Sequence, residues 1–236
     1  MLPATGLSIV LPCFNPHKDW LANIENNFSI LKKLTGSVEL IIVNDGSTLH
    51  FDEQAVKTLL TRYSDIQFIN YPINKGKGYA LREGVRNSKG DLVIYTDIDF
   101  PYTNESFENI LTALQKGADV AIGIRNEDYY THLPKTRILI SKFLRIIIKM
   151  FLRIPTTDTQ CGLKGFNQKG KTIFLQTTIN RYLFDLEFIF IAARKRLNLQ
   201  TVEVVLKPGI QLSSMRWTIL LQEFGNFLKI FVKSLF

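Results

Sequence analysis

The sequence is poor in the residues that build disulfide-rich or zinc-binding domains. Its 236 residues include two cysteines, Cys13 and Cys161, and neither belongs to a Cys-x-x-Cys pair. We therefore expect neither a structural zinc site nor a disulfide framework, and a reducing compartment such as the cytoplasm fits this cysteine usage. The histidines are also few, because His17, His50 and His132 stand far apart and suggest no shared ligand site.

Long uninterrupted apolar runs are missing as well. No stretch of about 18 residues is both apolar and uncharged, so we expect no membrane-spanning helix. The N-terminus lacks a basic region followed by an apolar core, so we expect no signal peptide. No internal repeat is visible, and a hydrophobic content of 46% is typical of a globular chain. Length and composition thus predict one domain spanning residues 1–236.

Positive charge exceeds negative charge along the chain. Lysine and arginine total 29, aspartate and glutamate total 21, and the formal net charge is +8. This balance favours an anionic partner such as a nucleotide, a lipid phosphate or an anionic membrane surface. Because the sequence has no zinc-finger or RRM signature, we do not expect a nucleic acid as the partner.

Short apolar runs alternate with helical patterns over the first half of the chain. Such alternation is typical of an α/β fold with a Rossmann-like, mostly parallel sheet flanked by helices. The expected strands lie near residues 7–12, 38–43, 66–71, 91–97 and 119–124. The expected helices lie near residues 18–34, 52–63, 76–88 and 104–116, the last with Asn104 as its N-cap. Farther along, we expect strands at 162–166 and 200–206, and helices at 168–176, 184–197 and in the last 20 residues.

Two carboxylates, Asp97 and Asp99, stand where the fourth apolar run ends. In an α/β sheet, ligands bind at the carboxyl ends of the strands, so these side chains would lie in the binding crevice. Carboxylate oxygens suit Mg²⁺ or Mn²⁺, and such an ion can bridge a diphosphate. The same sheet edge would receive Asn15, Asp45 and Lys77 from the ends of the preceding strands.

Five short motifs occur in order along the first half of the chain. They are Pro12-Cys13-Phe14-Asn15, Val43-Asn44-Asp45-Gly46-Ser47, Asn74-Lys75-Gly76-Lys77-Gly78, the Asp97/Asp99 pair and Gly123-Ile124-Arg125. Together they resemble the family-2 glycosyltransferases of the GT-A fold. Residues 158–166 and 184–187 resemble the branch of that family that makes dolichyl- or undecaprenyl-phosphate sugars. The resemblance extends from residue 7 to residue 217.

The resemblance implies an inverting transfer of a hexose from a nucleoside-diphosphate sugar to a polyprenyl or dolichyl phosphate. UDP-glucose is favoured as the donor because residues 158–162 are similar to the glucosyl branch, while UDP-GlcNAc and GDP-mannose stay open. The implied cofactor is Mg²⁺ or Mn²⁺, with Asp97 and Asp99 as metal ligands. Residues 1–100 would form a nucleotide-sugar half and residues 101–236 an acceptor half.

The resemblance also assigns roles to individual residues. Those implied for catalysis are Asp97, Asp99, Asp158 and Asp185. Those implied for binding the nucleotide sugar are Pro12, Phe14, Asn15, Asp45, Lys77 and Asp97. Those implied for binding the acceptor phosphate are Arg125, Arg137 and Ser141, of which the last two are four residues apart and so share a helical face.

Several of these residues also have an ordinary structural interpretation. Asp45 can belong to an Asp-Gly turn, and Lys77 can be a solvated lysine beside glycines. The two arginines, Arg125 and Arg137, can pair with Glu127, Asp128 or Asp158. Glu187 can orient the acceptor, act as a base, or pair with Arg194 or Lys195.

The sequence departs from the family pattern at three positions. Pro16 and Pro101 stand where relatives often have glutamate and a glutamine metal ligand, and Arg216 stands near the place of a common lysine. Two other functions stay open, and Pro16 and Pro101 leave room for the second of them. One is a GT-A glycosyltransferase that uses a saccharide acceptor and needs a general base. The other is a non-catalytic, membrane-bound sensor of nucleotide sugars.

Two segments have the pattern of basic amphipathic helices. In residues 137–153, Lys142, Arg145, Lys149 and Arg153 follow one another at helical spacing, and the remaining faces are apolar. Residues 217–236 combine a polar stripe with aromatic and aliphatic bulk. Both patterns favour helices that lie in a membrane interface, which predicts peripheral association with the cytoplasmic face of a membrane. The alternative is packing on the protein body or on a second subunit, which would give a homo-oligomer.

We expect the chain to bind anionic vesicles. Changing Lys142, Arg145 and Lys149 to glutamine should weaken binding mainly at low salt, because each basic side chain contributes about 1 kcal/mol near an anionic surface. Deleting residues 217–236 should weaken binding at every salt concentration, because burial of apolar side chains is not screened. Co-sedimentation with vesicles across a salt series measures both effects. Wild-type protein that stays in the supernatant throughout would contradict the membrane prediction.

Overall fold

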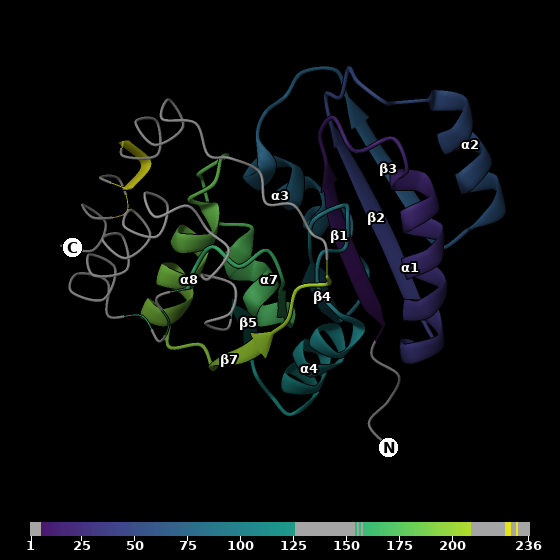
Figure 1. The fold of residues 1–236 in the computed structure, drawn as a ribbon. Coiled ribbons are helices and arrows are strands. Elements are labelled where there is room, and N and C mark those ends of the chain that lie inside the picture. The colour runs from purple at the N-terminus through teal and green to yellow at the C-terminus, as the bar shows by residue number, and fades with distance from the viewer. Residues whose placement is uncertain are drawn as a thin grey trace.

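The computed structural model describes residues 6–125, 154, 156, 158–208, 225–227 and 230. Within these residues, seven strands form one sheet, and helices cover both of its faces (Figure 1). The strands are β1 (Leu7–Cys13), β2 (Val38–Asp45), β3 (Ile66–Tyr71), β4 (Leu92–Tyr95), β5 (Val120–Arg125), β6 (Lys164–Phe166) and β7 (Leu199–Val204). The helices are α1 (Trp20–Thr35), α2 (Glu53–Arg62), α3 (Lys77–Asn87), α4 (Asn104–Gln115), α7 (Gln168–Phe174) and α8 (Phe184–Arg194).

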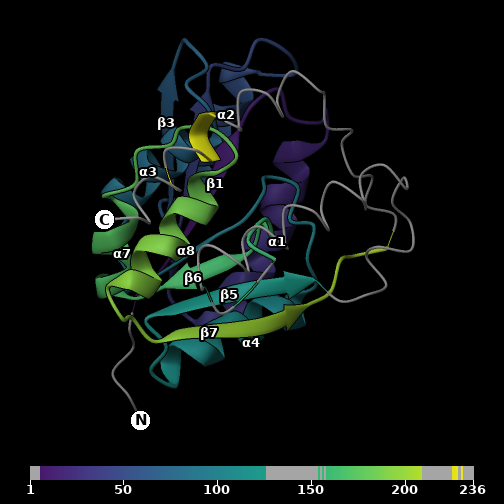
Figure 2. The same ribbon diagram turned by 90° about the vertical axis from the view of Figure 1, so that its left-hand side faces the viewer.

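The strand order is β3-β2-β1-β4-β6-β5-β7. Only β6 runs against its neighbours, since it pairs antiparallel with β4 and with β5 while the other pairs are parallel. The expected α/β architecture with a mostly parallel sheet is therefore confirmed. Parallel strands end at the same edge of a sheet, so the loops after β1, β2, β3 and β4 gather there. Figure 2 shows β5, β6 and β7 side by side near the other end of the sheet.

The sheet is buried on both faces, which explains why its central strands are almost continuously apolar. One face packs against α1, α2 and α4 through side chains such as Phe28, Leu59 and Ile110. The opposite face packs against α3, α7 and α8 through side chains such as Leu81 and Phe188. The two core clusters make a three-layer arrangement in which a helix layer lies on each side of the sheet (Figures 1 and 2).

The helix and strand boundaries follow the sequence pattern within a few residues, with two informative differences. Asn104 is the first residue of α4 and not its N-cap, because the side chain of Thr103 accepts the hydrogen bond from the backbone N–H of Ser106. Strand β4 ends at Tyr95, so Asp97 and Asp99 lie in the loop that follows it. A turn closed by a backbone hydrogen bond from Phe100 to the carbonyl of Asp97 shapes that loop.

Some sequence predictions fall on residues outside the described part. The basic segment 137–153, Arg137 and Ser141 within it, and most of residues 217–236 belong to this group. Among the helices that the structure does describe, none combines the length and the apolar character needed to cross a bilayer.

Candidate active site

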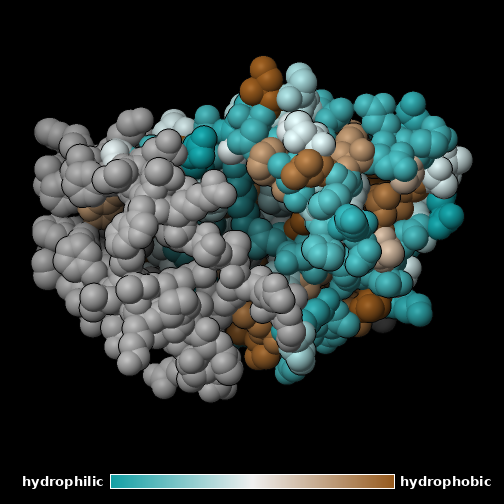
Figure 3. All heavy atoms as spheres, turned by 45° about the horizontal axis from the view of Figure 1, so that its top comes forward, coloured by the Kyte–Doolittle hydropathy of each residue, from teal (hydrophilic) through white to brown (hydrophobic). Residues whose placement is uncertain are grey.

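The loops that follow the parallel strands form one surface of the molecule. Figure 3 turns the top of Figure 1 toward the viewer, and the described part of that surface is mainly hydrophilic with a few hydrophobic side chains among it. Phe14, Leu49 and Ile73 are exposed hydrophobic residues of the loops after β1, β2 and β3. Phe14, which the resemblance assigns to nucleotide binding, is 51% exposed, whereas Pro12 is partly buried within β1.

Asn15 connects the loop after β1 to the loop after β2. Its backbone N–H donates to Oγ of Ser47 at 2.9 Å, and its Oδ1 accepts from the backbone N–H groups of Thr48 and Leu49 at 2.8 and 3.0 Å. Asn15 also has φ of 47°, a left-handed conformation that asparagine tolerates better than most residues. In this structure its side-chain oxygen shapes the loops, and a direct contact with a nucleotide stays a prediction.

Asp45, the last residue of β2, holds the loop between β3 and α3 in place. It is buried, and its Oδ1 accepts from the backbone N–H of Lys75 at 2.7 Å. Its Oδ2 accepts from the backbone N–H of Gly76 and from the side chain of Asn74, both at 2.9 Å. These contacts reach farther than the Asp-Gly turn that the sequence suggests. They fix the segment that leads into α3, and contact of Asp45 with a base or ribose stays a prediction.

Asp97 contacts one residue from the first half of the chain, Lys77, and one from the second half, Gly162. Its Oδ1 forms an ion pair with Nζ of Lys77, the first residue of α3, and the two side chains are 39% and 27% exposed. On the other side lies Gly162, where an added Cβ would stand 2.6 Å from Oδ2 of Asp97. Burial alone would lower the pKa of Lys77, but the charges of Asp97 and Asp185 raise it overall. Lys77 is therefore a cation held at a carboxylate, and not a solvated lysine.

Asp99 lies beside Asp97 and is exposed. Its pKa is raised, first because surrounding protein displaces water from the carboxylate and then because Asp97 adds negative charge. Phe100 follows it with φ of 48° and a buried ring, a conformation that costs a bulky residue about 1–2 kcal/mol. A cavity of about 340 Å³ adjoins Asp99 and is also lined by His17, Asp19, Trp20, Asn23 and Ile98.

The pair of carboxylates fits a divalent cation of the Mg²⁺ or Mn²⁺ class. Among the residues that the structure describes, no group of three or more His, Cys, Asp or Glu side chains is placed to hold a metal. Asp97 and Asp99 would thus be the protein ligands, and phosphate oxygens and water would complete the shell, as is usual for Mg²⁺. Pro101, where relatives often have glutamine, offers only a carbonyl that accepts from the backbone N–H of Lys207 at 2.8 Å.

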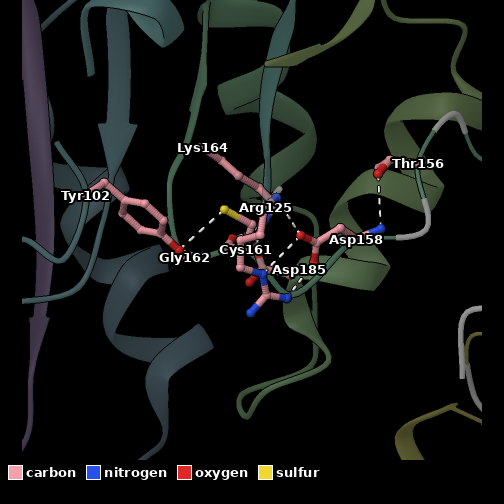
Figure 4. A network of polar contacts seen from close by, with 8 residues as sticks. All are labelled: Tyr102, Arg125, Thr156, Asp158, Cys161, Gly162, Lys164 and Asp185. Atoms are coloured by element: carbon pink, nitrogen blue, oxygen red, sulfur yellow. Dashed lines mark hydrogen bonds and ion pairs between the residues drawn. The ribbon is translucent and has the colours of Figure 1, made fainter. Parts of the chain in front are cut away.

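A second charged pair joins the end of β5 to the segment before β6 (Figure 4). The backbone N–H and Nε of Arg125 donate to Oδ2 of Asp158 at 2.8 and 3.0 Å, and Nη2 donates to Oδ1 at 2.5 Å. Their side chains are only 13% and 10% exposed. Burial alone would raise the pKa of Asp158, but the hydrogen bonds and charge of Arg125 lower it overall. Asp158 is thus a weak proton acceptor that orients Arg125.

A third pair joins Lys164 of β6 to Asp185 of α8 (Figure 4). Nζ of Lys164 is 2.9 Å from Oδ1 of Asp185, and their side chains are 0% and 6% exposed. The same Nζ donates to the carbonyl of Cys161, and the Tyr95 hydroxyl donates to Oδ1 of Asp185. Asp185, for which the resemblance implies a catalytic role, is therefore part of a buried hydrogen-bond network.

Sequence reasoning missed three residues of this site. They are Gly162, Lys164 and Tyr102. Gly162 lies beside Asp97, and the hydroxyl of Tyr102 accepts from the Gly162 backbone N–H at 2.9 Å. A lysine inside an otherwise apolar strand was an available signal, because buried lysines occur almost only with a partner. Glu187, for its part, accepts from the backbone N–H groups of Thr178 and Ile179, both at 2.8 Å, so it holds the segment before α8.

Comparison with known proteins decides the family. The model of the family described as glycosyl transferase family 2 matches residues 8–173. The chain belongs to this family. A dolichyl-phosphate β-glucosyltransferase of Trichomonas vaginalis is 29% identical over 219 residues, which are 86% of this chain and 66% of the relative. The human dolichyl-phosphate β-glucosyltransferase is 30% identical over 80% of this chain and 64% of its own length. The chain thus spans just under two thirds of these relatives.

Solved structures establish the fold. Mannosyl-3-phosphoglycerate synthase from Rubrobacter xylanophilus aligns with a TM-score of 0.71 at 15% identity, over 98% of this chain and 74% of that chain. Glucosyl-3-phosphoglycerate synthase from Mycobacterium tuberculosis, crystallised with Mn²⁺, UDP-glucose and phosphoglyceric acid, aligns with a TM-score of 0.68 at 15% identity, over 98% and 79%. The expected GT-A fold and the expected family are both confirmed.

The contact between Gly162 and Asp97 makes a prediction about metal binding. Gly162→Ala should push the Asp97 carboxylate aside and lower the affinity for Mn²⁺ at least about tenfold, because small displacements of a binding group are costly. The melting temperature should change little, since the clash falls on a side-chain end. Gly6→Ala is a matched control, because its added methyl group would be 3.6 Å from Gly90 Cα. A variant that binds Mn²⁺ as the wild type does would exclude this contact as a determinant.

The Arg125–Asp158 pair predicts a pH-dependent stability. The folded-state pKa of Asp158 is lowered, so its contribution is complete above the unfolded pKa of about 3.9 and is lost as the pH falls through the folded value. Asp158→Asn should cost about 3–5 kcal/mol of unfolding free energy at pH 7 and progressively less below pH ~4. Asp65→Asn, which breaks an exposed pair with Lys32, should cost at most about 1 kcal/mol. Urea unfolding at several pH values tests this, and a pH-independent difference would contradict it.

Proposed function

We propose that the chain transfers glucose from UDP-glucose to a polyprenyl or dolichyl phosphate, with inversion at the anomeric carbon. The observation that carries the proposal is that two charged pairs lie on segments that are linked by the contact of Gly162 with Asp97. Asp97, Asp99 and Lys77 come from the nucleotide-sugar half, and Arg125 and Asp158 come from the acceptor half. Support comes from relatives named dolichyl-phosphate β-glucosyltransferases that align over most of this chain.

The donor would bind at the edge formed by the loops after β1 to β4. Asp97 and Asp99 would hold Mg²⁺ or Mn²⁺, which when bound supplies Lewis-acid stabilisation to the leaving diphosphate. Lys77 is close enough to Asp97 to add a second positive charge near that diphosphate. Phe14 offers an exposed ring for the nucleoside, while Asn15 and Asp45 keep the surrounding loops in place.

The acceptor phosphate would meet the charge of Arg125, and we propose that Arg137 and Ser141 contribute to the same binding. An acceptor oxygen forms a bond to the anomeric carbon while the bond from that carbon to the diphosphate breaks, and the diphosphate leaves with the electron pair. A lipid monophosphate has its second pKa near about 6, so its attacking oxygen is already largely deprotonated at neutral pH. A sugar hydroxyl would instead need a general base.

The carboxylates of the acceptor half favour the phosphate over a hydroxyl acceptor. The pKa of Asp158 is lowered by Arg125, and Asp185 is committed to an ion pair with Lys164. Glu187 is buried and accepts backbone hydrogen bonds. None of these three carboxylates is placed as an unengaged base, and an acceptor that arrives deprotonated requires none. We propose that the enzyme works at the cytoplasmic face of a membrane, where such a lipid resides.

A panel of nucleotide sugars tests this function. Purified protein with polyprenyl phosphate and Mn²⁺ or Mg²⁺ should form a glucosyl lipid from UDP-glucose, and much less product from UDP-GlcNAc or GDP-mannose. EDTA should abolish the reaction, and Asp99→Asn should slow it by about 100-fold or more, because the variant keeps the shape but loses the charge that the metal requires. Thin-layer separation of radiolabelled lipid product gives the measurement.

Other outcomes of the panel identify other functions. Transfer to saccharides but not to polyprenyl phosphate would support a saccharide glycosyltransferase. Donor binding without transfer or hydrolysis would support a sensor. Full activity in EDTA would exclude the metal function of Asp97 and Asp99.

A further inference from the structure

Lys77 occupies a position that helix energetics alone does not favour. It is the first residue of α3, and the first turn of that helix contains no acidic residue. The N-terminus of a helix carries partial positive charge, so a cation there is unfavourable unless an anion compensates it. Asp97 is that anion, because its Oδ1 forms the ion pair with Nζ of Lys77.

A second carboxylate acts on the same ammonium group. The charge of Asp185, after that of Asp97, contributes to the raised pKa of Lys77 against the effect of burial. Asp185 is itself held by two buried partners, since its Oδ1 is 2.9 Å from Nζ of Lys164 and accepts from the Tyr95 hydroxyl. Lys77 is therefore paired with one carboxylate that can serve as a metal ligand, and the charge of a second carboxylate, itself paired with Lys164, also favours the ammonium form.

We propose that Lys77 is the resident counter-ion of Asp97 and has to release that carboxylate before Asp97 can ligate a divalent cation. This inference rests on the metal function given to Asp97 and Asp99 above. Oδ1 of Asp97 carries the ion pair, and Oδ2 lies where a Cβ at residue 162 would stand, in space that the glycine leaves open. The ammonium group and a divalent cation thus compete for Asp97.

The exchange couples metal binding to donor binding. Once released, Lys77 still has Asp185 as an anionic neighbour, so its charge stays in the site. A diphosphate would offer the released ammonium group a new partner and make the release less costly. By linkage, a diphosphate that favours the released state must strengthen metal binding, and metal must strengthen diphosphate binding by the same factor.

Binding of Mn²⁺ to the intact protein tests the exchange without any turnover. Free Mn²⁺ is measured by electron paramagnetic resonance during titration of wild type, Lys77→Met and Lys77→Arg, each with and without UDP. Lys77→Met removes the competing charge and keeps an unbranched side chain. Without UDP it should bind Mn²⁺ roughly tenfold more tightly than wild type, whereas Lys77→Arg should not. The strengthening of Mn²⁺ binding by UDP should be smaller in Lys77→Met than in wild type.

Lys75→Met is the matched control. Lys75 lies two residues before Lys77, in the loop that leads into α3, and its Nζ donates to the Tyr79 hydroxyl at 3.2 Å. This variant should bind Mn²⁺ as wild type does. Thermal unfolding in EDTA checks that each variant is folded.

The sign of the effect separates the proposal from a structural role. A merely structural lysine would make Lys77→Met bind Mn²⁺ more weakly, and equal affinities in wild type and Lys77→Met would likewise overturn the exchange. Absence of Mn²⁺ binding in every variant, with and without UDP, would overturn the metal site as well. Tighter Mn²⁺ binding in Lys77→Met supports the exchange even if no lipid product forms, so failure of the proposed glucosyl transfer remains distinguishable.

Discussion

The position of one carboxylate, Asp97, organises the rest of the site. One of its oxygens is paired with Lys77 from α3, and the other is bounded by the bare backbone of Gly162. Those two contacts come from opposite halves of the chain, more than 80 residues apart along it. The Asp97 carboxylate keeps both contacts only if α3, the end of β4 and the segment before β6 hold their relative positions. Two further charged pairs, Lys164 with Asp185 and Arg125 with Asp158, connect the neighbouring segments and are more deeply buried.

Three pairs of opposite charges lie in this part of the protein. Lys77 faces Asp97, Lys164 faces Asp185, and Arg125 faces Asp158. Removing a charge pair from water costs several kcal/mol per ion, and good geometry and additional hydrogen bonds offset that cost. Such pairs give little net stability compared with apolar packing. They fix the relative positions of the charged groups that they join.

The layout of the fold was predictable because it depends on periodicity. Apolar runs of four to eight residues predicted most of the strands, and the carboxylates after the fourth run lie in the loop after β4, where a metal site stays a prediction. The cap of α4 was misassigned by one residue because Thr103 and Asn104 are both good caps, and the choice depends on backbone angles. For Asn15 and Asp45 the sequence predicted the edge of the sheet but not their contacts. Those contacts depend on which loops meet in space.

Lys164 shows most clearly what a single sequence lacks. A lysine within Leu163–Phe166 indicates that an anionic partner must exist, yet the partner, Asp185, stands on a helix that begins 20 residues later. Gly162 is similar, because the need for a missing side chain becomes visible only when Asp97 lies beside it. Such roles depend on contacts between residues far apart along the chain, so the local sequence pattern does not predict them.

The antiparallel strand β6 has a consequence for how the protein forms. It is only three residues long, yet it fills the gap between β4 and β5, which have no direct pairing with each other. When a ribosome has produced the chain as far as residue 125, β1 to β4 can associate, but β5 has no neighbouring strand until residues 164–166 emerge. A nascent chain therefore holds an unpaired, apolar strand during synthesis of about 40 residues, a condition that favours aggregation. The segment that closes the sheet is also the one that brings Gly162 to Asp97, so this contact forms only when the sheet becomes continuous.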